Sequence, residues 1–245
     1  MGSLAFPVIL NHWLKKTLIE IQLTNPRGLN GDSAKPPNRL ERSMTEPNKI
    51  SFHGPFHWCR SINSGTGRTS PDFGEFTKRT GVYLWTIEKD GDELIHYVGH
   101  TFQDFRKRHQ QHCSEFVKGH YGIYDARYLR EGVRKALFKG VWNVKGAEKK
   151  KVREHFIENR GEILSWVGPY LDQLRIWVAA IDDREWSGRL ETAIYEKIIS
   201  DTSCRSIRLL PKMESHTFHH TTQPKQTVHL QLTRNFDGLS SEIRI

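Results

Sequence analysis

Hydrophobic and polar positions alternate most clearly between residues 80 and 101, where the pattern predicts two strands joined by a tight turn. The stretch GVYLWTIE is rich in β-branched and aromatic residues, and ELIHYVGHT repeats that character after the polar sequence KDGD. Asp90-Gly91 is a strong signal for a two-residue hairpin. The strands are therefore expected to pair antiparallel and to bring Tyr83 and Tyr97 close together on a small sheet.

Three later segments predict the remaining regular structure. Residues 102–118 carry apolar or aromatic side chains at helical spacing, as do residues 184–200, and both are expected to be helices. Residues 174–182, LRIWVAAID, are expected to form a third strand. The residues that carry the helical spacing are Phe105, His109, His112 and Phe116 in the first helix, and Leu190, Ile194 and Ile198 in the second.

The rest of the chain surrounds this central region. Residues 1–72 are expected to be an N-terminal arm or linker, of which residues 50–76 mix aromatic and turn residues and are expected to pack on the domain that follows. Residues 73–205 are expected to be the folded domain, with an insertion at about 119–172 that ends in one helix over 146–167. Residues 206–245 form a C-terminal extension. The predicted fold class is α+β.

Charge points to an anionic partner. The 245 residues include 37 Lys and Arg against 28 Asp and Glu, a net charge of +9, which favours nucleic acid over a membrane surface. No run approaches the roughly 18 apolar residues of a membrane-spanning helix. The three cysteines are too scattered for a disulfide framework, so a reducing compartment, the cytoplasm, is expected.

A set of reactive side chains is expected to meet on the small sheet. Arg108 and His112 are four residues apart and share one face of a helix that begins shortly after the strand of Tyr97. Glu191 lies on the helix whose apolar stripe must dock on the same sheet. One carboxylate, two tyrosines, an arginine and a histidine suit phosphodiester cleavage. The acid can hold a divalent cation, the cation and the arginine can neutralise phosphate, and a phenol or imidazole can move a proton.

The order GVY, YVG, DFRKRHQQH and RLETAIYEKI resembles the GIY-YIG nuclease superfamily over residues 80–112 and 173–200. The resemblance implies a three-stranded antiparallel sheet flanked by helices, one divalent metal (Mg²⁺, with Mn²⁺ as a substitute) and cleavage of nucleic-acid backbones. Its restriction-enzyme branch has a histidine similar to His112. The remaining implied roles are Tyr83 and Tyr97 as motif tyrosines, Gly81 and Gly99 as structural glycines, Arg108 facing phosphate, and Glu191 binding metal.

Three features depart from the family pattern. The thirteen residues between GVY and YVG exceed the usual spacing slightly. Arg106 competes with Arg108 for the arginine role, although an Asp-Phe pair just before them favours Arg108. Many members have an asparagine after the glutamate, and here either Asn235 returns to the site, His216 replaces it, or the contact is absent.

The leading interpretation is a metal-dependent endonuclease acting on double-stranded DNA, of the sequence-specific restriction type, with a homodimer expected on a palindromic target. A homing or repair nuclease and a non-catalytic nucleic-acid-binding protein are the alternatives, and RNA as substrate is open. Tyr83 is expected to act as general base, with its pKa lowered by Arg108 and the cation. Candidate substrate contacts are Gly99, Arg106, Arg127, Arg130, Lys149 and Lys150; a second GIY, residues 122–124, is interpreted as a coincidence in a loop.

Overall fold

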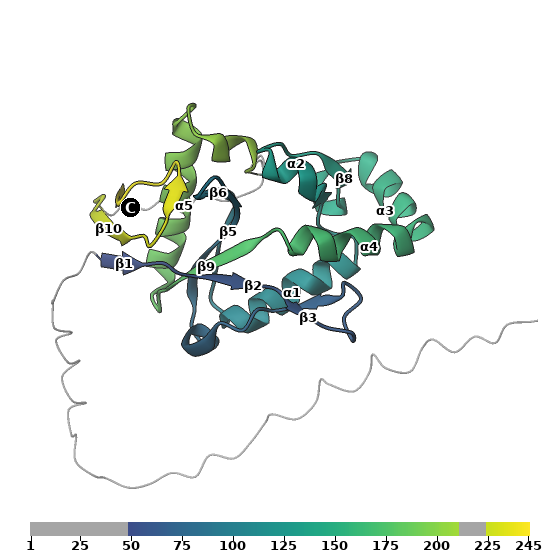
Figure 1. Ribbon diagram of the computed structural model, residues 1–245, viewed down its shortest axis with the longest axis horizontal. Helices are drawn as coiled ribbons and strands as arrows, with labels where there is room; N and C mark the ends of the chain where they lie inside the picture. Colours follow the sequence, from purple (N-terminus) through teal and green to yellow (C-terminus); the bar gives the residue numbers. More distant parts are fainter. Residues whose placement is uncertain (1–48, 211–223) are drawn as a thin grey trace, which may run out of the picture. The chain divides into compact units, whose positions relative to one another are not determined.

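The predicted hairpin forms the centre of the computed structural model, which describes residues 49–210 and 224–245 (Figure 1). Strands β5 (Gly81–Lys89) and β6 (Asp92–Thr101) pair antiparallel. The turn between them places Asp90 and Gly91 at φ values of 56° and 87°, the left-handed conformation that such turns require. Residues 1–48 of the predicted arm and His216 lie outside the described residues.

The third predicted strand and the two predicted helices take the expected places around the hairpin. β9 (Arg175–Ala180) pairs antiparallel with the free side of β5. The helix α1 (Phe105–Val117) follows β6 closely, and α5 (Arg184–Ser200) has the predicted bounds. Both helices begin at an aspartate whose side chain accepts a hydrogen bond from a backbone N–H of the first turn.

The sheet is larger than the three strands predicted from sequence. Its order is β11-β6-β5-β9-β2, in which β2 (His53–His57) pairs antiparallel with β9 and β11 (Asn235–Asp237) pairs parallel with β6. The edge strands escaped prediction because HGPFH contains glycine and proline, and because NFD is too short to show an alternating pattern.

Segments on both sides of the predicted boundaries at residues 72 and 205 contribute strands to shared sheets. A second sheet of order β1-β10-β12 joins β1 (Lys49–Ser51), near the N-terminal side, to β10 (Thr227–Gln231) and β12 (Glu242–Arg244). One compact unit spans residues 45–245. The prediction that residues 50–76 pack on the domain is confirmed, since Phe52, Trp58 and Phe73 are buried in its core.

The single helix predicted over 146–167 of the insertion is replaced by two helices. α3 (Glu148–Glu158) ends at Asn159, whose side-chain amide donates to the carbonyl oxygen of His155, and α4 (Arg160–Leu171) starts directly after it. The second GIY sequence lies partly on a short strand rather than in a loop. The other elements are β7 (Ile123–Tyr124), α2 (Ala126–Arg130), β8 (Ala136–Phe138), β3 (Cys59–Arg60), β4 (Arg68–Thr69) and short 3₁₀ turns at Gly74–Phe76, Val141–Asn143 and Arg205–Arg208.

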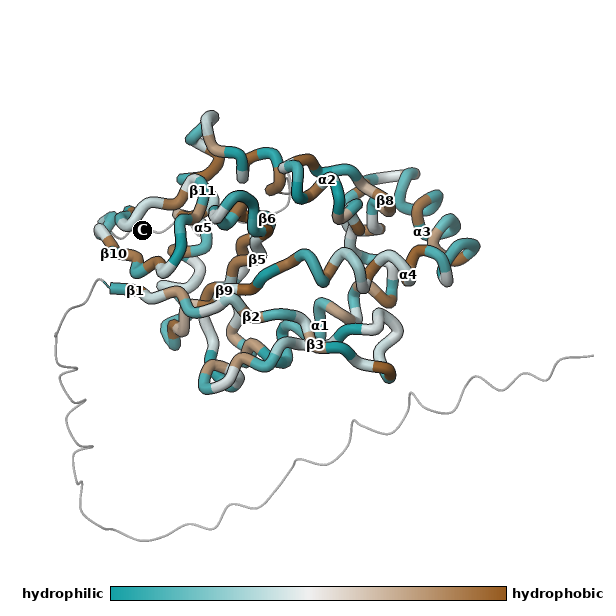
Figure 2. The backbone as a smooth tube through the Cα atoms, in the orientation of Figure 1, coloured by the Kyte–Doolittle hydropathy of each residue, from teal (hydrophilic) through white to brown (hydrophobic). Residues whose placement is uncertain are grey.

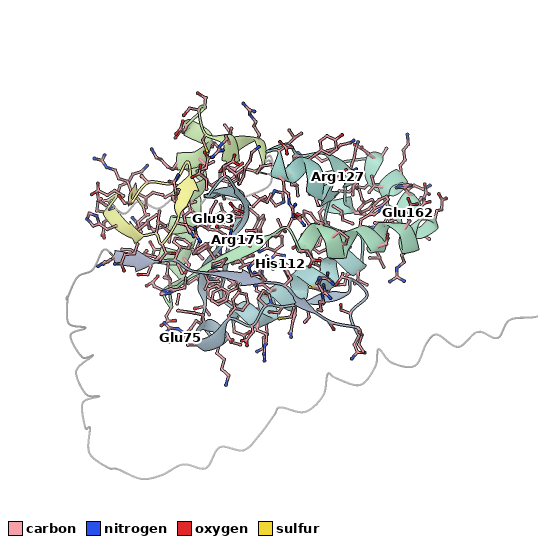
Figure 3. The ribbon with its side chains drawn as sticks, in the orientation of Figure 1. Glu75, Glu93, His112, Arg127, Glu162 and Arg175 are labelled. Carbon is pink, nitrogen blue, oxygen red and sulfur yellow. The ribbon has the colours of Figure 1, made fainter. Side chains whose placement is uncertain are left out.

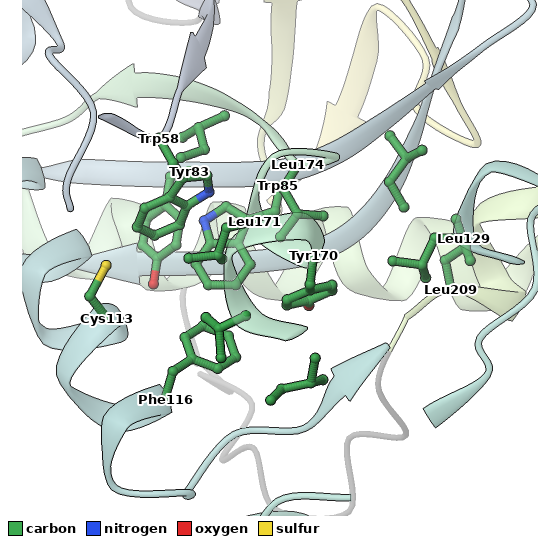
Figure 4. Packing of buried hydrophobic residues seen from close by; sticks show 14 of the residues in the cluster. Trp58, Tyr83, Trp85, Cys113, Phe116, Leu129, Tyr170, Leu171, Leu174 and Leu209 are labelled. Atoms are coloured by element: carbon green, nitrogen blue, oxygen red, sulfur yellow. The ribbon is translucent and has the colours of Figure 1, made fainter. Parts of the chain in front are cut away.

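Two hydrophobic layers cover the two faces of the sheet. Val82 and Leu84 of β5 face α5, whereas Tyr83 and Trp85 face the layer that contains side chains of α1 and α4. The brown stretches of Figure 2 follow this central part of the sheet. Figure 4 shows Tyr83 and Trp85 beside Phe116 of α1 and Leu171 of α4. The tyrosine of the GVY motif is therefore part of a packed aromatic core.

A β-bulge in β6 decides which face Tyr97 occupies. Thr86 pairs with Ile95, but Trp85 pairs with Tyr97, so His96 is an extra residue in β6. Without it the register would put Tyr97 on the face opposite Tyr83, because side chains alternate along a strand. The extra residue thus accommodates the long spacing between the two motifs and brings both tyrosines to one face, with ring centroids 6.0 Å apart.

Gly99 lies directly opposite Tyr83 in this register, and the tyrosine ring occupies the space where a side chain would project. A Cβ on Gly99 would lie 2.7 Å from the Tyr83 hydroxyl oxygen and 2.7 Å from the Tyr97 ring. The glycine therefore serves the packing of the two tyrosines, as the structural role implies, and its contact with substrate stays a prediction.

Gly99→Ala is expected to lower the free energy of unfolding by about 1–3 kcal/mol, because the added methyl group forces the packed rings to move. Denaturant unfolding of the two proteins measures the difference. Gly161→Ala in α4 is the control, since a Cβ there meets no atom within 4 Å. An equal effect of the two substitutions would contradict the packing role.

Candidate active site

The hydroxyl group of Tyr83 is the point at which the predicted catalytic side chains meet. Arg108 Nε donates to this oxygen over 3.1 Å, and His112 Nε2 lies 2.8 Å from it. Both residues extend from one face of α1 because they are one helical turn apart. Arg106, the alternative arginine, is exposed on the same helix. The structure therefore brings Arg108, and not Arg106, to the tyrosine.

His112 connects Tyr83 to a third tyrosine from the insertion. Its Nδ1 lies 3.1 Å from the hydroxyl of Tyr121, which is half-buried and packs edge-on against Trp142. Burial and the nearby Arg108 hold the pKa of His112 well below its usual range, so the imidazole is neutral. With its proton on Nδ1, directed at Tyr121, the Nε2 atom is free to accept the Tyr83 proton.

A second histidine of α1, His109, packs against the ring of Tyr83. His109 Nδ1 donates to the Phe105 carbonyl over 2.8 Å, and its Nε2 accepts from the Trp85 indole over 3.3 Å. Its ring centroid lies 4.9 Å from that of Tyr83 in an edge-on arrangement. Every polar atom of this imidazole is thus used in the core, which identifies His109 as a packing and positioning residue.

Arg108 acts on the pKa of Tyr83 in the predicted direction, but the net pKa is raised rather than lowered. Tyr83 is completely buried, and burial raises its pKa well above 10.0; the neighbouring Tyr97 adds to the rise, and Arg108 opposes it without overcoming it. Burial likewise raises the pKa of Tyr97. Both phenols are neutral, because removing their hydration penalises the phenolate more than one arginine compensates.

Glu191 approaches the tyrosines from the other helix. It lies on α5, is 8% exposed, and its Oε2 is 2.5 Å from His100 Nδ1 of β6. Its charge raises the pKa of Tyr97, after the larger effect of burial. β11 pairs with residues 92–94 of β6. Glu191 therefore contacts the far end of β6, which also carries Tyr97 and has no pairing with β11.

The remaining predicted contacts lie elsewhere. Arg127 and Arg130 belong to α2, where Arg127 is paired with Asp125 and Arg130 donates to Gln173. Lys149 and Lys150 are exposed on α3, where Lys150 is 3.8 Å from Glu154. Figure 3 shows Arg127 well separated from His112. These four side chains are surface groups of the insertion.

Asn235 does not return to the site. It is paired with Asp92 in the sheet, and its side-chain amide donates to the Asp92 carboxylate over 2.7 Å. Asp92 begins β6, whereas Gly99 lies seven residues further along, a distance of roughly 23 Å in an extended strand. Asn235 therefore ties the C-terminal segment to the hairpin turn.

Sequence reasoning did not assign roles to His100 and Tyr121 at the site. His100 directly follows YVG, so its neighbourhood could have been inferred, but its contact with Glu191 depends on how α5 docks. Tyr121 lies three residues before Tyr124, at the start of the insertion. Its contact with His112 depends on the path of the chain after α1, which returns through Gly119, a residue with φ of 71°.

No family model matches this chain, and no curated protein or solved structure is significantly similar to it. Among the described residues, no helix is both long enough and apolar enough to cross a membrane. The functional argument therefore rests on the site itself.

The buried histidines are expected to make the protein acid-sensitive. Burial lowers the pKa values of His96 and His109 from 6.5 to about 3. At pH values between about 3 and 6.5 these histidines bind protons in the unfolded chain but not in the folded chain. The free energy of unfolding therefore falls as the pH drops below about 6.5. Each histidine is expected to cost on the order of 2 kcal/mol between pH 7 and pH 5.

Urea unfolding at pH 7 and pH 5 measures this loss for the wild type and for His109→Gln. The variant is expected to show a loss smaller by on the order of 2 kcal/mol. His229→Gln, at an exposed histidine, serves as the control and should keep the wild-type difference. A pH dependence unchanged by His109→Gln would contradict the assignment.

Proposed function

We propose that this protein is a metal-dependent endonuclease that hydrolyses phosphodiester bonds in double-stranded DNA. The observation that carries the proposal is the double contact of the Tyr83 hydroxyl with Arg108 and His112, next to Tyr97 and the buried carboxylate of Glu191. A purely structural core would not need an arginine, a neutral histidine and a nearby acid around the same phenols.

In the proposed reaction Tyr83 removes a proton from the attacking water, and His112 accepts the phenol's own proton at Nε2. When His112 donates its Nδ1 proton to Tyr121, the imidazole is in the tautomer that can do so. Arg108 donates to the phenolate oxygen that forms and lies close enough to neutralise a phosphate. Because Tyr83 is buried without substrate, DNA binding must open a path from its hydroxyl to the scissile phosphate.

Glu191 is the residue that would hold the cation. Among the described residues no cluster of three or more His, Cys, Asp or Glu side chains could bind a metal alone. A single carboxylate nevertheless fits Mg²⁺ or Mn²⁺ in phosphoryl-transfer chemistry, where substrate phosphates and water supply the other ligands. A cation bound there supplies charge stabilisation to the departing 3′-oxygen. The charges of Arg108 and Glu191 both act on the pKa of Tyr97, and in the proposed reaction Tyr97 hydrogen-bonds the phosphate or the water.

The net charge of +9 and the basic insertion support DNA as the substrate. Base recognition requires elements outside the small catalytic sheet, and the insertion at residues 119–172 offers them, which supports a sequence-specific enzyme of the restriction type. Two copies would match a palindromic target. A homing or repair nuclease is the nearer alternative. A binding protein without catalysis is less well supported, because an acid beside the phosphate site opposes binding unless a cation is present.

Purified protein is expected to cut a long DNA of mixed sequence into discrete fragments with Mg²⁺ or Mn²⁺ and to leave it intact with a chelator. Glu191→Ala and Tyr83→Phe are each expected to lower the cleavage rate about 100-fold or more. Gel electrophoresis of the products measures the rates. A smear would indicate a non-specific or structure-selective enzyme. Cleavage of duplex RNA but not of DNA would show that the substrate is RNA.

Arg106 and Arg108 provide a matched pair on one helix for the same assay. Arg108→Ala is expected to lower the rate at which bound DNA is cleaved about 100-fold, whereas Arg106→Ala is expected to leave that cleavage rate nearly unchanged. Full cleavage by Tyr83→Phe would overturn the role of Tyr83 as general base, whereas a salt-sensitive band shift without any cleavage would replace the nuclease by a binding protein.

Exposed lysines of α3 are expected to contact the DNA backbone. The double variant Lys149→Ala, Lys150→Ala should reduce the slope of log affinity against log salt concentration by about 1.8, since each phosphate contact contributes about 0.9. Fluorescence anisotropy with a DNA duplex at several salt concentrations measures the slope. Lys225→Ala, at an exposed lysine near β10, is the control. Equal slopes for the double variant and the wild type would place the DNA away from α3.

A further inference from the structure

His100 stands beside the proposed metal-binding carboxylate, in a place to which the sequence assigned no role. It is the residue after Gly99 in β6 and pairs with Val82, so its side chain lies on the face that α5 covers. The Nδ1 atom is 2.5 Å from Glu191 Oε2, and the two side chains are 18% and 11% exposed. The pair is therefore shielded but open to solvent on one side.

Neighbouring groups hold the imidazole in this position. The Phe102 ring packs against the His100 imidazole with centroids 4.8 Å apart. The Arg184 guanidinium in turn lies 4.2 Å from the centroid of the Phe102 ring. His100 is thus packed against Phe102, and Phe102 against Arg184, between the end of β6 and the start of α5. A supported imidazole nitrogen next to a carboxylate oxygen is a preorganised pair of donor atoms.

The spacing of the two atoms suits adjacent ligands of one cation. Metal-to-ligand distances of about 2.1 Å in an octahedral ion place neighbouring ligand atoms about 3 Å apart. The present 2.5 Å contact is a hydrogen bond, so a cation that binds both atoms would displace the proton between them and separate them by about a further 0.5 Å. The described residues contain no cluster of three such ligands, so phosphate oxygens and water would complete the coordination.

We propose that His100 and Glu191 together form a two-ligand cation site that selects Mn²⁺ or a similar transition-metal ion over Mg²⁺. Imidazole nitrogen binds transition-metal ions, whereas Mg²⁺ takes carboxylate, carbonyl and water ligands. The site lies within the proposed nuclease centre, and the inference rests on that function for the phosphate that completes the coordination. Binding of a cation by the two side chains can be measured whether or not the protein cleaves DNA.

A simpler role for His100 is to hold Glu191 by a hydrogen bond. Glutamine in its place can donate the same kind of hydrogen bond but is a poor ligand for transition metals. His100→Gln therefore separates ligation from positioning. The chain also offers a matched control, because His229 and Glu242 form a second histidine–glutamate pair, 3.4 Å apart and largely exposed.

The test is electron paramagnetic resonance of the full chain with Mn²⁺, alone and with a DNA duplex that carries a non-hydrolysable linkage. Wild-type protein is expected to bind Mn²⁺ and to show the nitrogen hyperfine modulation of a coordinated imidazole, with Mg²⁺ displacing it only in about tenfold or greater excess. His100→Gln should lose the nitrogen modulation and bind Mn²⁺ about tenfold more weakly, Glu191→Gln should lose most binding, and His229→Gln should match the wild type.

Absence of the nitrogen modulation in the wild type, or equal Mn²⁺ binding by wild type and His100→Gln, would overturn the proposal and leave His100 as a positioning residue. Absence of Mn²⁺ binding even with DNA would remove the cation site. Nitrogen modulation that depends on His100 in a protein that cuts no DNA would sustain the metal site while the proposed nuclease activity fails.

Discussion

The extra residue in β6 is the constraint on which the candidate site depends. Antiparallel strands alternate their side chains strictly, so two tyrosines fourteen positions apart across a tight hairpin would face opposite sides in an uninterrupted ladder. The bulge at His96 shifts the register by one residue between Thr86 and Trp85 and turns Tyr97 to the face of Tyr83. Gly99 then provides the space in which the Tyr83 ring lies. Arg108 and His112 can meet one phenol because that ring is held against α1.

Burial sets the chemistry of these residues in the protein without substrate. Desolvation raises the pKa values of the two tyrosines and lowers those of His109 and His112, so an aromatic core with neutral groups surrounds a single arginine. Such a core is stable at neutral pH and holds its hydrogen bonds in fixed directions. A phenol in this state becomes a base when a neighbouring acceptor takes its proton, and His112 lies where that acceptor must be.

The terminal segments are structural parts of the domain that carries the site. β2 closes one edge of the central sheet beside β9, and β11 covers the beginning of β6. Arg205 reinforces this junction by pairing with Asp92 of β6 and with Asp237 of β11. Because β11 pairs with residues 92–94, the end of β6 that carries Tyr97 and His100 is left free of this strand. The strand that stabilises the hairpin thus stops short of the residues proposed to act on DNA.

The sequence by itself determined the hairpin, the third strand, the bounds of α5 and the face shared by Arg108 and His112. These features follow from local turn chemistry and from side-chain periodicity, which need no knowledge of distant contacts. Tertiary structure decided the rest. The edge strands are short or interrupted by glycine and proline, and they form because a neighbouring strand offers unpaired backbone groups. The bulge, the raised pKa of Tyr83 and the contacts of Tyr121 and His100 arise from residues brought together by packing, and burial is a property of the whole fold rather than of any segment of it.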